Sequence, residues 1–209
     1  MSENQNLTVI RRARPEDMEE ILQMVGDIFE LEQGIDRKYN PIPECNLPKW
    51  WCMEKDNRII GAIAAWVEEN GIQMGRFAIH PDYRGQHLGT ALLKTAISAV
   101  FEQGVEFIRG GARDTTMHIL TPLGAKVNGE TVVFFGSNIT PFILYREDYE
   151  QALQANSCCG KKCSEGKDRS CCDKKCSEGE EGACCDKTEG CEAGECSEDK
   201  TGSCCGCNK

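Results

Sequence analysis

The residues best suited to chemistry lie in one run, Phe77 to Gly89, which reads FAIHPDYRGQHLG. Apolar residues open the run as a strand, and Pro81 ends the strand because proline has no N–H for a ladder. Arg84 and Gly85 then introduce a short turn, and an amphipathic helix begins directly after it. Unpaired amides in the first turn of a helix attract anions, and an arginine fork suits phosphate oxygens. The run therefore predicts a site for a phosphate-bearing ligand, the alternative being a basic turn with no ligand.

The loop also resembles the signature of a known family. PDYRGQHLGTALL is similar to the pyrophosphate loop of the GNAT superfamily of CoA-dependent N-acyltransferases. That signature has Arg or Gln, two residues, Gly, any residue, then Gly or Ala. Arg84 and Gly89 match its two ends, whereas His87 stands at the middle glycine. The order of elements extends the resemblance over about residues 6–150.

The resemblance implies that acetyl-CoA is the acyl donor. Backbone groups of the strand would contact pantetheine, and loop amides would hold the pyrophosphate. A Cβ at His87 would obstruct close approach of the backbone to phosphate, whereas an imidazolium would add a positive donor. The implied cofactor contacts are Phe77, Ala78, Ile79, Arg84, Gly85, Gln86, His87, Leu88, Gly89 and Thr90.

The proton donor that the family usually supplies is missing. Many GNAT proteins carry a tyrosine just ahead of a Gly-Phe pair, and here Leu120 takes the place of that tyrosine. Tyr145 and His118 are the candidate catalytic residues, with Cys52 a further thiol to consider. The competing interpretation is that Tyr145 packs in a strand and His118 lies on the surface.

A second chemical feature is a run of thirteen cysteines near the C-terminus. Thiolates at this density select soft ions, so the segment predicts binding of Zn²⁺, Cu(I), Cd²⁺ or arsenite. The alternatives are a redox-buffering tail and a peptide that awaits enzymatic modification. The candidate ligands are Cys158, Cys159, Cys163, Cys171, Cys172, Cys176, Cys184, Cys185, Cys191, Cys196, Cys204, Cys205 and Cys207.

Composition divides the chain into a domain and a tail. Residues 157–209 contain no Val, Ile, Leu, Met, Phe, Trp or Tyr, so they cannot bury enough apolar area to offset their ordering entropy. We therefore expect an acyltransferase-like domain over residues 1–152 and a disordered, cysteine-rich tail over residues 153–209. The N-terminus shows no secretory signal and no apolar run is long enough to span a bilayer, which predicts a cytoplasmic protein with reduced thiols.

The net charge of −10 bears on partners. An acidic chain argues against non-specific binding to nucleic acid and against an anionic membrane surface. It mildly favours a cationic or amine substrate, although ordinary solubility explains the charge equally well. The acceptor is expected to be an amine of a small molecule or of a protein, and the sequence does not identify it.

The hydrophobic pattern supplies the elements that would position these residues. It predicts a strand over residues 7–12, a helix from Pro15 to about Gly34, three antiparallel strands over residues 50–80 and the long helix after the loop. A strand over 107–112, a short helix over 115–120 and strands over 131–135 and 142–145 follow. The predicted fold is α/β (α+β), a mixed, mostly antiparallel sheet flanked by helices. The rival function is a soft-metal or metalloid binding protein with an inactive domain.

Overall fold

A computed structural model describes residues 7–158, and the predicted cysteine ligands from Cys159 onward lie outside this range. The strands are β1 (Val9–Arg12), β2 (Lys49–Lys55), β3 (Arg58–Glu68), β4 (Gly71–Ile79), β5 (Phe107–Ala112), β6 (Lys126–Val127), β7 (Val132–Phe134) and β8 (Ser137–Tyr145). The helices are α1 (Met18–Gln33), α2 (Leu88–Phe101), α3 (Asp114–Leu120) and α4 (Arg146–Cys158). The predicted α/β fold, a mostly antiparallel sheet flanked by helices, is confirmed.

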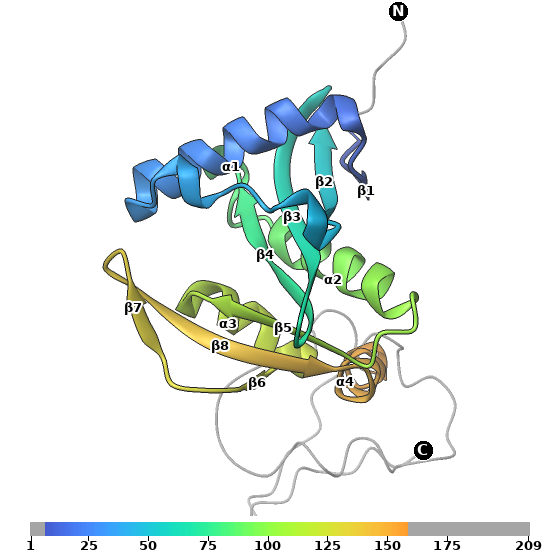
Figure 1. Ribbon diagram of the computed structural model, residues 1–209. Helices are drawn as coiled ribbons and strands as arrows, with labels where there is room; N and C mark the ends of the chain where they lie inside the picture. Colours follow the sequence, from blue (N-terminus) through green and yellow to red (C-terminus); the bar gives the residue numbers. More distant parts are fainter. Residues whose placement is uncertain (1–6, 159–209) are drawn as a thin grey trace, which may run out of the picture. The chain divides into compact units, whose positions relative to one another are not determined.

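The strands form one mixed sheet in the order β1-β2-β3-β4-β5-β8-β6, and β7 pairs with β8. Neighbouring strands are antiparallel except for β4 and β5, which are parallel. Helices α1 and α2 lie on opposite faces of the β2–β4 part of the sheet (Figure 1). The chain therefore covers one face of these strands with α1, forms β2, β3 and β4, and then covers the other face with α2.

The alternation of side chains along β2 explains how the sheet is covered on both faces. Trp50 and Cys52 pack in the core beneath α1, whereas Trp51 and Met53 pack in the core beneath α2. All four side chains are at most 6% exposed. Because successive residues of a strand point to opposite faces, a strand that is apolar at every position needs a helix on each side.

A charged cluster fixes the start of α1 to the first two strands. Arg11 of β1 donates to the Asp17 carboxylate at 2.5 and 2.9 Å and to Glu54 Oε2 of β2 at 2.7 Å. The Arg14 N–H also donates to Asp17 Oδ2 at 2.7 Å. These hydrogen bonds, that from Arg11 above all, lower the pKa of Asp17 to about 2.

Asp17→Asn should lower the free energy of unfolding by about 2 kcal/mol at pH 7, since each pH unit of pKa shift is worth about 1.4 kcal/mol. The folded pKa is depressed, so this stability is complete above the ordinary pKa of 3.8 and is lost as the pH falls towards 2. Urea unfolding at several pH values measures the difference between the two proteins. Glu16→Gln is the control because the Glu16 side chain is 67% exposed. A difference that stays constant from pH 7 to pH 2 would contradict this account.

The C-terminal part of the domain differs from the prediction in three ways. Strand β6 was not predicted. Strand β8 begins at Ser137, five residues before the predicted strand at Phe142. Helix α4 was not predicted, and it crosses the expected boundary at residue 152. Tyr149 fixes α4 to α2, since its ring is 3% exposed and its hydroxyl donates to the Lys94 carbonyl at 3.0 Å. Helix α4 thus packs against the core of the domain.

Candidate functional site

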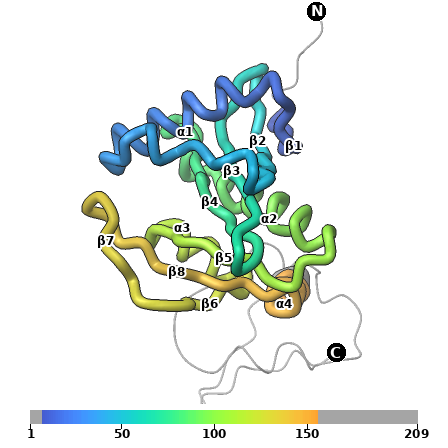
Figure 2. Tube along the Cα trace, viewed as in Figure 1, coloured from blue at the N-terminus to red at the C-terminus, as the bar shows by residue number. Residues whose placement is uncertain are grey.

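The parallel strands β4 and β5 separate soon after they pair. Their register has only two pairs, Ile72 with Ile108 and Gln73 with Arg109. Figure 2 shows the two strands diverging from this common end, with α1 on one side of the opening and β7 on the other. The edge of β4 that faces β5 therefore has no strand partner beyond Gln73, and its backbone groups are available to a ligand.

A bulge in β4 lies at this opening. Ala62 pairs with Ala78 and Ala64 pairs with Gly75, so the pairing of β3 with β4 shifts register between them. Within the bulge, Arg76 takes a left-handed conformation with φ of +55°. A non-glycine residue in this conformation costs roughly 1–2 kcal/mol, and such strain is concentrated at functional sites. The bulge thus changes the direction of β4 beside the cleft.

An outer cleft of about 590 Å³ follows β4 and the loop before α2. The first backbone hydrogen bond of α2 is donated by the Ala91 N–H to the His87 carbonyl at 3.1 Å. The amides of residues 88–90 precede this bond and have no acceptor within the helix. Nine of the ten predicted cofactor-contact residues line this cleft, and the exception is Gln86. Its wall comprises Ile28, Glu32, Gln33, Phe77, Ala78, Ile79, Tyr83, Arg84, Gly85, His87, Leu88, Gly89, Thr90, Arg113, Thr115, Thr116 and Ile119.

Glycine at position 89 allows α2 to approach β4 closely. A Cβ built on Gly89 would lie 3.1 Å from Phe77 Cζ and 3.5 Å from Ile79 Cγ1. The first distance is tighter than ordinary van der Waals contact, so a larger side chain would push α2 away from the strand. The close approach holds the first turn of α2 over the floor of the outer cleft.

Arg84 is held by two partners. Its Nε donates to the Ile79 carbonyl at 2.9 Å, and its Nη1 and Nη2 donate to the two carboxylate oxygens of Glu32 at 3.0 and 2.8 Å. Glu32 belongs to α1, so this bidentate pair joins the loop to the opposite side of the cleft. The predicted phosphate contact through Arg84 requires that the guanidinium exchange Glu32 for the ligand.

Two residues of the loop have a left-handed backbone conformation. Gly85 has φ of +76°, and His87 has φ of +57° at the N-cap of α2. His87 therefore supports the backbone conformation that a glycine adopts more readily at the middle position of the signature. His87 also lines the outer cleft.

An inner pocket of about 380 Å³ adjoins the outer cleft, and the two share Gln33, Phe77, Arg113 and Thr116. The remaining wall comprises Phe29, Ile35, Ile63, Trp66, Gln73, Met74, Gly75, Arg76, Leu93, Gly111, Ala112, Leu120, Val132, Phe134, Ile139 and Phe142. These residues come from α1, β3, the diverging strands β4 and β5, α2, α3, β7 and β8.

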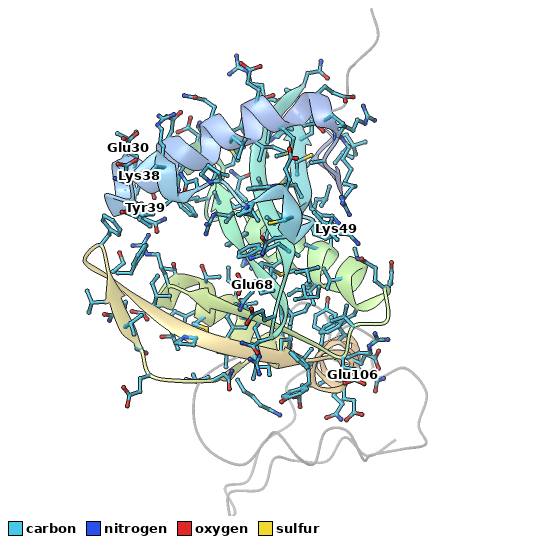
Figure 3. The ribbon with its side chains drawn as sticks, in the orientation of Figure 1. Glu30, Lys38, Tyr39, Lys49, Glu68 and Glu106 are labelled. Atoms are coloured by element: carbon cyan, nitrogen blue, oxygen red, sulfur yellow. The ribbon has the colours of Figure 1, made fainter. Side chains whose placement is uncertain are left out.

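The segment after α1 reaches the β7–β8 hairpin beside this pocket. Arg37 donates from Nε to Glu30 at 2.7 Å, which fixes the segment to the end of α1. The Tyr39 ring then lies 5.8 Å from the ring of Phe135, at the tip of the hairpin (Figure 3). Segments nearly one hundred residues apart thus meet at one end of the opening.

The predicted catalytic side chains lie elsewhere. Tyr145 ends β8, is 44% exposed and lines a separate hollow with Glu106 and Lys126. His118 is exposed on α3 and lines neither the outer cleft nor the inner pocket. Cys52 is fully buried in the core beneath α1, and burial raises the pKa of its thiol to about 11. The structure therefore brings none of the three to the junction of cleft and pocket.

Sequence reasoning did not find several residues that line the outer cleft, three of which lie at its junction with the inner pocket. Gln33 and Glu32 come from the last turn of α1, and Arg113 and Thr116 come from the end of β5 and from α3. They are ordinary polar residues of amphipathic elements. A weak signal existed only for Arg113, which directly follows a predicted strand end.

Comparison with known proteins agrees with this geometry. Residues 17–116 match the model of the acetyltransferase (GNAT) family. The domain has the fold of the GNAT acetyltransferases. Over 94 residues the chain is 28% identical to a Bacillus subtilis (strain 168) protein described as a candidate [ribosomal protein bS18]-alanine N-acetyltransferase. The match spans 45% of this chain and 62% of that relative, so it covers less than two thirds of the relative's length.

Solved GNAT structures superpose on the domain at low sequence identity. An acetyltransferase of the GNAT family from Staphylococcus aureus Mu50 has a TM-score of 0.55 and 18% identity, with 66% of this chain and 99% of that chain covered. Spermidine N-acetyltransferase from Vibrio cholerae, in complex with CoA and spermine, has a TM-score of 0.54 and 14% identity, with 68% and 98% covered. At these identities the likeness establishes the fold alone.

Two negative findings apply to residues 7–158. No helix in this range is long and apolar enough to cross a membrane. No group of three or more Cys, His, Asp or Glu side chains in this range is arranged to hold a metal ion. The second finding does not apply to the cysteine tail, because only Cys158, the last residue of α4, falls within the described part of the chain.

Proposed function

We propose that this protein is an N-acetyltransferase that transfers an acetyl group from acetyl-CoA to an amine, and that its cysteine tail binds soft metal or metalloid ions. The observation that carries the first part is the opening between β4 and β5, which ends at the glycine loop and the free first-turn amides of α2. Amides of this kind bind phosphate, and a free strand edge suits the amide groups of a pantetheine arm.

The residues of the domain would act by positioning. The loop and the first turn of α2 would hold the pyrophosphate, while backbone groups of β4 would orient the arm that carries the acetyl group. The inner pocket would place the amine from the other side. Among the described residues the inner pocket has no Asp, Glu, His, Lys, Tyr or Cys in its wall, so alignment and backbone dipoles would supply the rate enhancement, with water as proton acceptor.

The direct experiment is acetyl transfer by the full chain to a panel of amines, with the acetylated products detected by mass spectrometry. Reagents that detect the free thiol of CoA are unsuitable because the chain has 15 cysteines of its own. We expect product only when both acetyl-CoA and the full chain are present. A panel of amines that stays unmodified at millimolar acetyl-CoA would contradict the proposal.

Glu32→Gln should tighten acetyl-CoA binding by roughly three- to tenfold, as measured by calorimetry. The exposed pair with Arg84 is worth at most about 1 kcal/mol, and removing the carboxylate frees Arg84 while removing a negative charge beside the phosphate site. Glu30→Gln is the matched control, since Glu30 lies on the same helix and pairs with Arg37. Weaker binding by Glu32→Gln would mean that Arg84 serves only to hold the loop.

A second candidate is a soft-metal or metalloid binding protein whose domain is inactive. The specific observation in its favour is that, within residues 7–158, no Asp, Glu, His, Lys, Tyr or Cys lies in the wall of the inner pocket. The two functions differ in one measurement. An inactive domain would leave every amine unmodified even when the tail is loaded with Zn²⁺, Cd²⁺, Cu(I) or arsenite.

A further inference from the structure

The inner pocket differs in charge from the rest of the chain. Its wall has two ionisable side chains among the described residues, Arg76 and Arg113, and both are cationic. The chain as a whole has a net charge of −10. The charge of the pocket wall is therefore opposite in sign to the net charge of the chain.

Arg76 has neutral partners. Its Nε donates to the Asn40 carbonyl at 2.9 Å, and its Nη2 donates to the Tyr39 carbonyl at 2.8 Å. Its guanidinium carbon lies 5.5 Å from the ring of Trp66. Burial lowers the pKa of Arg76, with no carboxylate to oppose that effect. A partly buried cation of this kind gains stability from an anion that enters the pocket.

Arg113 lies where the inner pocket meets the outer cleft, since this residue lines both. None of the ion pairs within residues 7–158 involves Arg113 or Arg76. Arg84, in the outer cleft, is instead neutralised by Glu32 at 2.8 Å. The uncompensated positive charge is therefore on the acceptor side of the site.

The rest of the wall is mainly apolar. Phe29, Trp66, Phe77, Phe134 and Phe142 supply aromatic surface around a volume of about 380 Å³, near the lower end of the range for small-molecule sites. Among the residues that the structure describes, the inner pocket offers a polyamine no carboxylate for its additional ammonium groups, and the two arginines would repel them.

We propose that the inner pocket takes a small amine that carries an anionic group and an apolar body, the simplest example being an α-amino acid with an apolar side chain. The carboxylate would bind Arg76 and Arg113, the side chain would lie against the aromatic wall, and the amine would face the outer cleft. This assignment rests on the proposed acetyltransferase function. Transfer forms an N–C bond and breaks the C–S bond, and the ammonium loses one proton to the CoA thiolate and one to water.

The test uses two ligands that differ only in charge, N-acetyl-L-phenylalanine and N-acetyl-L-phenylalaninamide. Calorimetry with the reduced full chain, with and without CoA, should show at least tenfold tighter binding of the acid, as expected for hydrogen bonds to a charged group. Arg76→Gln should reduce that preference. Glutamine keeps a polar side chain and is no more strained than arginine at a φ of +55°. Arg113→Gln should reduce the preference in the same way, without touching the backbone bonds that Arg76 makes.

Several outcomes would overturn the assignment. They are equal binding of acid and amide, failure of the acid to bind at millimolar concentration, and tighter binding of spermidine than of the acid. A preference for the acid that survives in a correctly folded Arg76→Gln and Arg113→Gln double variant would also overturn it. Failure of this assignment can be told apart from failure of the proposed function. A chain that binds the acid but not acetyl-CoA would support the anion pocket and contradict the acetyltransferase proposal.

Discussion

Replacing Gly89 by valine is expected to weaken acetyl-CoA binding about 100-fold, which corresponds to about 2.7 kcal/mol. The Cβ alone would lie 3.1 Å from Phe77 Cζ, and the two methyl groups of valine would extend this contact. Forcing such groups into a packed contact typically costs 1–3 kcal/mol, and the helix can relieve the contact by moving off the strand. That movement displaces the first-turn amides that the proposed pyrophosphate site requires.

Ala91→Val is the matched control for this prediction. It adds two methyl groups two residues later in α2, at a residue that is exposed and does not line the outer cleft. Calorimetry with acetyl-CoA, together with thermal unfolding of both variants, separates a binding defect from a folding defect. Undiminished binding by Gly89→Val would show that the first turn of α2 does not hold the cofactor.

The second large effect is expected in the tail. Native mass spectrometry of the reduced full chain should show uptake of roughly three or four Zn²⁺ or Cd²⁺ ions, since thirteen thiolates fill about three separate tetrahedral sites and more when sulfurs bridge two ions. Thiols must lose protons to bind, so the ions should leave as the pH falls towards about 5. The motif CCxKKCSEG occurs at Cys158 and again at Cys171. Replacing Cys171, Cys172 and Cys176 with serine should remove about one ion if these repeats bind ions separately.

Cys45 and Cys52 provide the internal control for the tail. Replacing both with serine should leave the number of bound ions unchanged, because neither belongs to a metal-binding group in residues 7–158. A larger loss after the Cys171, Cys172 and Cys176 change would indicate a shared cluster with bridging sulfurs. A full chain that stays free of metal at micromolar Zn²⁺, Cd²⁺ and Cu(I) would rule out these ions.

The fold could be predicted wherever local pattern and burial agree. The 3.6-residue spacing of apolar residues located α1 and α2, and continuous apolar runs located β2 and β3. Helix α4 was missed because its sequence is polar, and its main attachment, Tyr149, depends on contacts with α2 far away in the chain. Strand β8 was shortened because Pro141 interrupts the strand signal, although Pro141 is paired with Gly111 in the sheet.

The candidate site could be predicted only where it is local in sequence. The loop from Arg84 to Gly89 is one continuous motif, so its place before α2 followed from the residues themselves. The partnership of Arg84 with Glu32 and the bulge at Arg76 depend on how distant strands and helices meet. The inner pocket, lined by residues of eight helices and strands, has no signature in any single stretch of sequence.

Titration of the wild-type full chain with acetyl-CoA by calorimetry tests the central claim most directly. The account predicts saturable binding at one site per chain, competed by free CoA and weakened about 100-fold by Gly89→Val but not by Ala91→Val. It also predicts binding that weakens at high salt, because the pyrophosphate contributes through its charge. An absence of heat at millimolar acetyl-CoA, from a protein that unfolds cooperatively, would contradict the claim that the opening between β4 and β5 is an acyl-CoA site.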